Sequence, residues 1–233
     1  MKRTFICLLG ILVMGSAGTL AARAADTEIS ASGTGSVSLP PNVATVSSSV
    51  ETFAEGADEA IADNNARYER ILGALLKLGV ARNDIALAYY NVNYNPRPPS
   101  GPNPGERYGY TVSRSFSVKV RRIGDTGRVS DACLGSGATS VDGVAFGLSD
   151  PTVARTQAAA KAVAEARANA IAVAQAAGLH IVGIKRLELV GGPLPPSPVP
   201  LMRAAAVAKE PTQFDQSNVS VTVSVNVVFV AGP

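Results

Sequence analysis

The stretch VSVTVSVNVVF, residues 219–229, is the clearest indication of secondary structure in this 233-residue sequence. Every odd position in it is apolar, whereas positions 220, 222, 224 and 226 carry Ser, Thr, Ser and Asn. Strict alternation of this kind predicts a β-strand with one buried face and one polar face. The chain is therefore expected to end on an amphipathic strand.

Other alternating stretches predict further strands upstream. The strongest runs from Tyr108 to Val120, and Arg114 interrupts its apolar face. Weaker strands are expected near residues 29–39, 43–53, 85–94, 141–148 and 181–190. Among them, Gly33-Thr34-Gly35 lacks the remaining elements of a phosphate-binding loop and is interpreted as a glycine bulge that bends the first strand.

Two long stretches have helical spacing instead. The first is expected from about Asp58 to Leu78, where Gly79 ends it, and the second from about Asp150 to Ala177, where Gly178 ends it. The second helix is expected to bury a stripe of small residues, namely Ala159, Val163, Ala166, Ala170, Val173 and Ala177. Small side chains would let it lie tightly on a sheet or on another protomer's helix.

These elements predict an α+β fold, a mostly antiparallel sheet backed by two long helices. Leu78-Gly79-Val80 and Ala177-Gly178-Leu179 each lead from a helix into a strand, so an internal duplication of strand–helix–strand units is also expected. Two proline-rich stretches, 96–105 and 193–200, cannot join a sheet ladder and are expected to be exposed loops. They are interpreted either as stiff connections or as docking sites for a partner.

The N-terminus resembles a secretory signal peptide. Lys2 and Arg3 precede an apolar stretch, and Ala22 and Ala24 supply the small residues of a cleavage site. Cleavage after Ala24 is expected, which leaves 25–233 as one mature domain in the periplasm; an uncleaved anchor is the alternative. Removal of this segment leaves 18 basic and 18 acidic residues. A neutral mature chain argues against nucleic-acid or anionic-membrane partners, and no integral membrane span is expected in it.

The sequence offers little catalytic material. His180 is the sole imidazole, and Cys133 is the sole thiol after the predicted cleavage, so no internal disulfide is expected. Neither residue lies in a nucleophile motif, and no His and Cys spacing suggests a metal site. We therefore expect no enzyme activity, cofactor or metal. For Cys133, a buried thiol is the favoured interpretation and a redox role the alternative.

Tyrosines gather around the first proline-rich loop. Tyr89, Tyr90 and Tyr94 precede it, and Tyr108 and Tyr110 follow it. On adjacent strands they would either pack against one another or border a groove for a small molecule or peptide. Arg114, on the same predicted strand as Tyr108 and Tyr110, is expected either to reach solvent at an edge or to pair with an acid across an interface.

Taken together, the motifs resemble the SIMPL-domain family, and within it the bacterial periplasmic immunogenic proteins. The resemblance spans nearly the whole mature chain and is carried by these segments: Gly33-x-Gly35, Pro41-Asn42-x-Ala44, Asn64-Asn65, Leu78-Gly79-Val80, Gly109-Tyr110, Asp150-Pro151, Ala177-Gly178 and Val221 to Phe229. Asn42 departs from the family, which usually carries Asp there. The resemblance implies a periplasmic α+β protein that self-associates, with no established catalytic residues. The leader, the small-residue helix face, the long terminal strand and the scarcity of catalytic side chains favour a homo-oligomeric, non-enzymatic role in envelope integrity or oxidative-stress tolerance; a ligand-binding module is the alternative.

Overall fold

The computed structural model describes residues 27–101, 106–190 and 212–233. Its strands are β1 (Thr27–Leu39), β2 (Val43–Ala54), β3 (Ile85–Asn95), β4 (Gly109–Val120), β5 (Ser140–Gly147), β6 (His180–Val190) and β7 (Val219–Gly232). Its α-helices are α1 (Ala57–Lys77), α2 (Thr126–Gly135) and α3 (Thr152–Ala176), and the short 3-10 turns are η1 (Arg82–Asp84) and η2 (Ile123–Asp125). All seven predicted strands are present, and α2 was not predicted.

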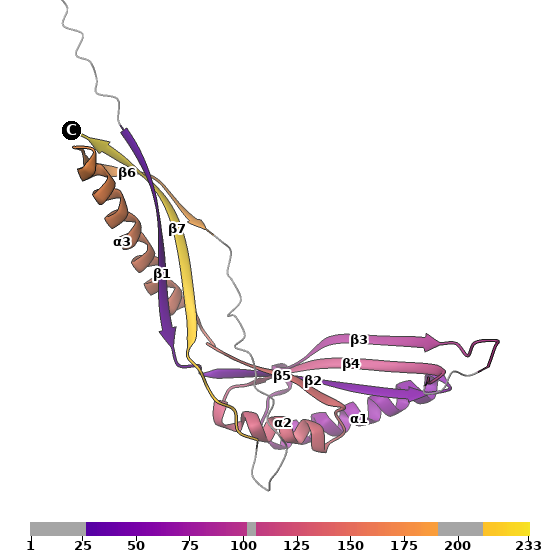
Figure 1. Cartoon of the computed structure of the whole chain (residues 1–233). Coiled ribbons are helices and arrows are strands. Elements are labelled where there is room, and N and C mark those ends of the chain that lie inside the picture. The colour runs from indigo at the N-terminus through magenta and orange to yellow at the C-terminus, as the bar shows by residue number, and fades with distance from the viewer. Residues whose placement is uncertain (1–26, 102–105, 191–211) are drawn as a thin grey trace, which may run out of the picture.

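The strands form two antiparallel sheets rather than one. One sheet has the order β1-β7-β6, and the other has the order β3-β4-β2-β5. Figure 1 shows them as two arms that meet where β1 passes into β2. The expectation of a single sheet backed by both long helices is therefore wrong, because α3 packs on β1 and β7 while α1 packs on β2 and β4. The predicted duplication is not confirmed, since the two sheets differ in strand number and order.

Strands β1 and β7 pair without interruption from Thr27 opposite Ala231 to Leu39 opposite Val219. The glycines of β1 therefore do not form the expected bulge. They face α3 instead, and a Cβ on Gly33 or Gly35 would lie 2.1 or 1.9 Å from a backbone carbonyl oxygen of the helix. Their function in the fold is to let a helix backbone approach the strand closely.

The buried stripe of α3 differs from the predicted one. It consists of alanines four residues apart, namely Ala154, Ala158, Ala162, Ala166, Ala170 and Ala174. Only Ala166 and Ala170 were expected; Val173 is exposed. Successive positions four apart advance by about 40° around a helix of 3.6 residues per turn. The contact line therefore winds around α3 as the helix follows the twisted β1–β7 pair (Figure 1).

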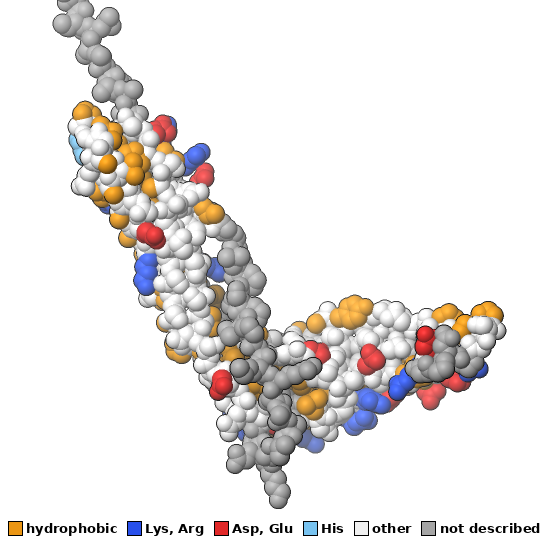
Figure 2. All heavy atoms as spheres, in the orientation of Figure 1, with side chains coloured by type: hydrophobic (Ala, Val, Ile, Leu, Met, Phe, Trp, Pro, Cys, Tyr) orange, Lys and Arg blue, Asp and Glu red, His pale blue; other side chains and the backbone are white. Residues whose placement is uncertain are grey.

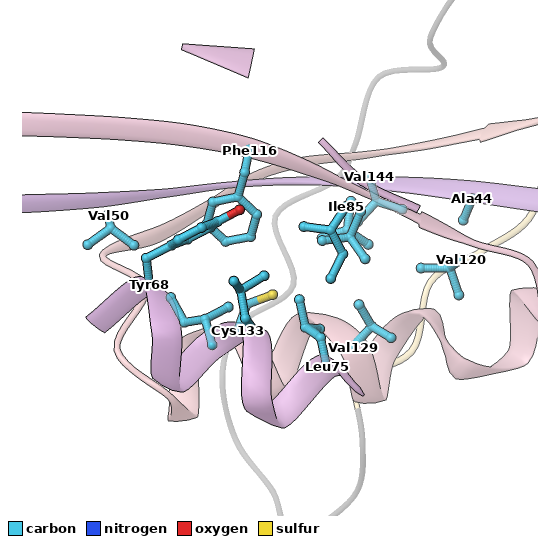
Figure 3. Packing of buried hydrophobic residues seen from close by; sticks show 14 residues of the cluster. Ala44, Val50, Tyr68, Leu75, Ile85, Phe116, Val120, Val129, Cys133 and Val144 are labelled. Carbon is cyan, nitrogen blue, oxygen red and sulfur yellow. The ribbon is translucent and has the colours of Figure 1, made fainter. Parts of the chain in front are cut away.

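The core of the other arm lies between the four-stranded sheet and the helices α1 and α2 (Figure 3). Tyr68 of α1 meets Phe116 of β4 edge to face, with ring centroids 5.3 Å apart. Asn64 is fully buried beside them, and its amide nitrogen donates to the backbone oxygens of Val50 and Val112, each at 3.2 Å. This amide fastens α1 to β2 and β4.

The predicted helix ends agree with the structure. Gly79 and Gly178 adopt positive φ values of 84° and 72° after α1 and α3, as expected of helix C-caps. Asn42 accepts a hydrogen bond from the Ser149 backbone at 2.7 Å, so its amide oxygen acts as a carboxylate oxygen would.

The predicted signal peptide, the loop 193–200 and residues 102–105 of the first proline-rich loop lie outside the described residues. No helix in the described ranges is long and apolar enough to cross a membrane.

Candidate functional site

The imidazole and the thiol singled out in the sequence lie in different arms. His180 is an exposed residue at the start of β6, whereas Cys133 of α2 lies in the core beneath the four-stranded sheet (Figure 3). Burial raises the pKa of the Cys133 thiol to about 11, and a hydrogen bond with Ser48 opposes this only in part. The thiol is therefore protonated at neutral pH, which disfavours its reaction as a nucleophile. In the described parts of the chain, no three His, Cys, Asp or Glu side chains are grouped to hold a metal ion.

A surface pocket of about 300 Å³ lies among the C-terminal end of α1, the end of β4 and the start of α2. Inside it, Arg121 donates to both carboxylate oxygens of Asp84, at 2.7 and 2.8 Å. Arg122 forms a second ion pair with Asp125 at 2.7 Å. These pairs hold η1 and η2 against the end of β4, which is a structural role.

The Asp84 ion pair makes the stability of the fold depend on pH. The Arg121 hydrogen bonds hold the pKa of Asp84 below its usual value of 3.8, and burial opposes them. The stabilisation is therefore complete above the unfolded pKa and is lost as pH falls through the lower folded pKa. We expect the Asp84→Asn variant to be less stable than wild type at pH 7 and to lose less stability between pH 5 and pH 3.

Urea unfolding midpoints at pH 7, 5, 4 and 3 would measure this difference. Glu69→Gln, which changes an exposed acid on α1, is the matched control and should follow the wild-type pH profile. Parallel pH profiles for wild type and Asp84→Asn would contradict the role of the ion pair.

Arg114 lies on β4, an inner strand, and therefore not at a sheet edge, where one of the two expectations placed it. Its guanidinium carbon lies 4.5 Å from the ring centroid of Tyr68 and 5.0 Å from that of Tyr90, typical of cation–π contacts. Its Nη2 donates to Oδ1 of Asn65 at 2.6 Å. Arg114 thus contacts α1 and β3 of its own chain, and the expected acid across an interface stays a prediction. Asn65 and Tyr68 were missed at this site, although their spacing of three residues places both on one side of a helix.

The predicted tyrosines lie on both faces of the sheet. Tyr90 and Tyr94 face the helix side with Tyr110, whose ring centroid is 4.8 Å from that of Tyr94. Tyr89 follows the bulge at Ala88, pairs with Ser115 and faces the opposite side. Tyr108 donates to Glu106 at 2.7 Å. The structure thus places Tyr90, Tyr94 and Tyr110 on one face, where Tyr94 and Tyr110 are in contact, and places Tyr89 on the other. The described pocket contains none of these tyrosines.

None of the helices in the described residues covers the outer part of the helix side at β3. Leu87, Tyr90, Val92 and Tyr94 form this β3 stripe; they pair with the helix-side residues Phe116, Arg114, Val112 and Tyr110 of β4. Their exposed fractions range from 36% at Val92 to 59% at Leu87 and Tyr94. Hydrophobic side chains follow the upper edge of this arm in Figure 2, while charged side chains gather on its lower side along α1.

A similar surface lies on β6, an edge strand of the three-stranded sheet. Ile184, Leu187 and Leu189 form this β6 stripe; they pair with Phe229, Val227 and Val225, which α3 buries on the same face. Helix α3 covers β1 and β7 but reaches β6 at few points, so Leu187 and Leu189 are 45% and 66% exposed. Each arm therefore presents an apolar stripe on an edge strand beside its helix. The alternating pattern predicted apolar faces on both strands but not their exposure.

Comparisons of the sequence with known proteins identify a matching family and similar proteins. The profile of the SIMPL family, described as a protein of unknown function (DUF541), matches residues 29–229. A 26 kDa periplasmic immunogenic protein of Brucella melitensis biotype 1 is 30% identical over 211 residues, which cover 86% of this chain and 83% of that protein. The protein of the same name from Brucella abortus is 29% identical with the same coverage.

Proposed function

This chain belongs to the SIMPL family, and from that premise we propose that it is a non-enzymatic periplasmic protein that assembles with copies of itself. Export through a signal peptide cleaved after Ala24 is part of the proposal, and the periplasmic relatives support it. The assembly would act as a scaffold that supports envelope integrity or oxidative-stress tolerance.

The observation that carries this proposal is the pair of apolar stripes that the described parts of the chain leave exposed. Exposed hydrophobic residues are ordinary when they are scattered, but a contiguous row on an edge strand is typical of an interaction surface. Here two such rows lie on two different sheets of one chain. A chain with two separate contact surfaces can bind two neighbours, which is the requirement for an assembly larger than a dimer. The burial of Cys133 supports a non-enzymatic role.

Light scattering of the purified mature protein at micromolar concentration tests the assembly. We expect a mass several times that of one chain. The double variant Leu187→Lys/Leu189→Lys places charges in the β6 stripe and should weaken association at least tenfold, because burial of each leucine contributes about 1.5–3 kcal/mol. Val153→Lys, at an exposed position near the start of α3, is the matched control and should retain the wild-type mass.

A monomeric wild-type protein would overturn the proposal. The physiological part needs a bacterium that lacks the gene, complemented with wild type or with the double variant. Wild type, but not the double variant, should restore survival in detergent or peroxide. Equal rescue by wild type and the double variant would contradict the proposal that the cellular role depends on assembly.

A further inference from the structure

The edge of β3 differs from the other sheet edges in its charge. Strands β1, β5 and β6 also lie at edges, and each carries at least one charged side chain, such as Glu28, Asp142 and Lys185. The eleven residues of β3 include none. Charged side chains are a common protection of edge strands against pairing with another chain. The backbone edge of β3 lacks that protection.

Two features limit the part of β3 that can pair. The bulge at Ala88 interrupts the register between Leu87 and Tyr89, so the faces before and after it are out of phase. Pro96 follows the strand at its other end, where it cannot donate a ladder hydrogen bond. The regular segment between these limits is Tyr89–Asn95, and its central residue is Val92.

We propose that the segment Tyr89–Asn95 pairs antiparallel with the same segment of a second copy, about a two-fold axis at Val92. This inference rests on the proposed self-association and names one of its interfaces. In this register Val92 lies opposite Val92 of the second copy, and Tyr90 lies opposite Tyr94. Asn91 and Asn93 oppose each other on the other face. All seven residues find a partner.

The geometry of the segment favours this occupant. A shift by one residue would place apolar side chains opposite the polar face, so antiparallel pairing must be centred on a residue. A centre at Val92 retains the longest paired stretch within the limits set by the bulge and Pro96. Because the segment is uncharged, two copies meet without repulsion, and tyrosine pairs across strands are favourable. The two β3 stripes would join into one apolar strip on the helix side of an eight-stranded sheet.

Cross-linking through one introduced cysteine tests the register. In antiparallel pairing, opposed Cα atoms lie about 4.5–5.5 Å apart, within the range of a disulfide. The Val92→Cys variant of the full chain, oxidised under mild conditions, should form a disulfide-linked dimer at least tenfold more abundantly than wild type. Wild type carries the same native cysteines, Cys7 and the buried Cys133, and is the control for both.

Leu87→Cys is the matched control on the same strand. Leu87 is more exposed than Val92. In this register, however, position 87 lies opposite position 97 of the second copy, so the two Leu87 residues are ten positions apart along the strands, roughly 33 Å. It should therefore give no more dimer than wild type. Equal cross-linking at positions 87 and 92 would indicate parallel or non-specific contact and would overturn the proposal. Absence of a dimer from a folded Val92→Cys variant would overturn it as well.

A second pair of variants keeps the test valid if Val92→Cys does not fold. Asn91→Cys or Asn93→Cys alone should form no disulfide-linked dimer, because position 91 of one copy lies opposite position 93 of the other. The two variants should cross-link when their chains are mixed and reassembled. The outcome is separable from that of the proposed function. A multimeric wild type without these cross-links would refute the β3 pairing and leave self-assembly in place. Cross-linked dimers from a wild type that is monomeric by light scattering would support the pairing and refute the larger scaffold.

Discussion

Replacing Gly35 with alanine is expected to destabilise the protein by about 3 kcal/mol, because the new Cβ would overlap the backbone of α3. That atom would lie 1.9 Å from the carbonyl oxygen of Ala158 and 2.6 Å from the amide nitrogen of Ala162. Backbone atoms cannot rotate away as a side chain can, so α3 must move off β1 and expose its alanine stripe. Thermal unfolding monitored by circular dichroism should show a melting temperature lower by roughly 6–12 °C.

The matched control for this substitution is Gly143→Ala. Gly143 also lies in a strand, β5, but a Cβ there would have no neighbour within 4 Å. We expect its melting temperature to stay close to the wild-type value. Gly33→Ala should resemble Gly35→Ala, since its Cβ would lie 2.1 Å from the Ala162 oxygen. An unchanged melting temperature for both β1 variants would mean that α3 does not lie against β1 as described.

The second large effect is expected at Asn64. Asn64→Ala removes the amide that donates to the Val50 and Val112 oxygens and leaves a small cavity in the core. Loss of a donor to buried acceptors costs about 1–3 kcal/mol, and two acceptors are affected here. We expect a loss of about 2–3 kcal/mol in the free energy of unfolding. Urea unfolding, monitored by tyrosine fluorescence and circular dichroism, would measure it.

Asn65→Ala is a control at the adjacent residue of the same helix. Asn65 is exposed, and its described hydrogen bond is the one from Arg114. Because this bond lies at the surface, its loss should cost about 1 kcal/mol or less, as is usual for exposed charged interactions. Similar losses for the two variants would argue that Asn64 acts through helix propensity and not through its bonds to the sheet.

The sequence predicted the local elements well because their signals are local. Alternation of apolar and polar residues marks a strand wherever it lies, as residues 219–229 illustrate in β7. Gly79 and Gly178 marked the ends of two helices through their freedom at positive φ. The helix α2 escaped notice because it has ten residues, several of them Gly, Ser and Thr, and its apolar face depends on little more than Val129 and Cys133.

The candidate site was predicted only in part. The cluster of tyrosines and Arg114 was visible in the sequence, but the cation–π contacts of Arg114 with Tyr68 and Tyr90 join residues from α1, β4 and β3. The bulge at Ala88 also reverses the face on which Tyr89 would otherwise lie. Neither feature follows from spacing along one strand, because each depends on the register with a neighbour.

The sequence alone determined the strands, the long helices and the family resemblance, since each depends on the order of residues within a short segment or on their arrangement along the chain. Only the tertiary structure decided that the strands divide into two sheets, that α3 lies on the glycines of β1, and that β3 and β6 keep apolar faces uncovered. The physical reason is that alternation specifies which side chains share a face but not what covers that face. The covering element is chosen by contacts between residues far apart in sequence, such as Gly35 and Ala158.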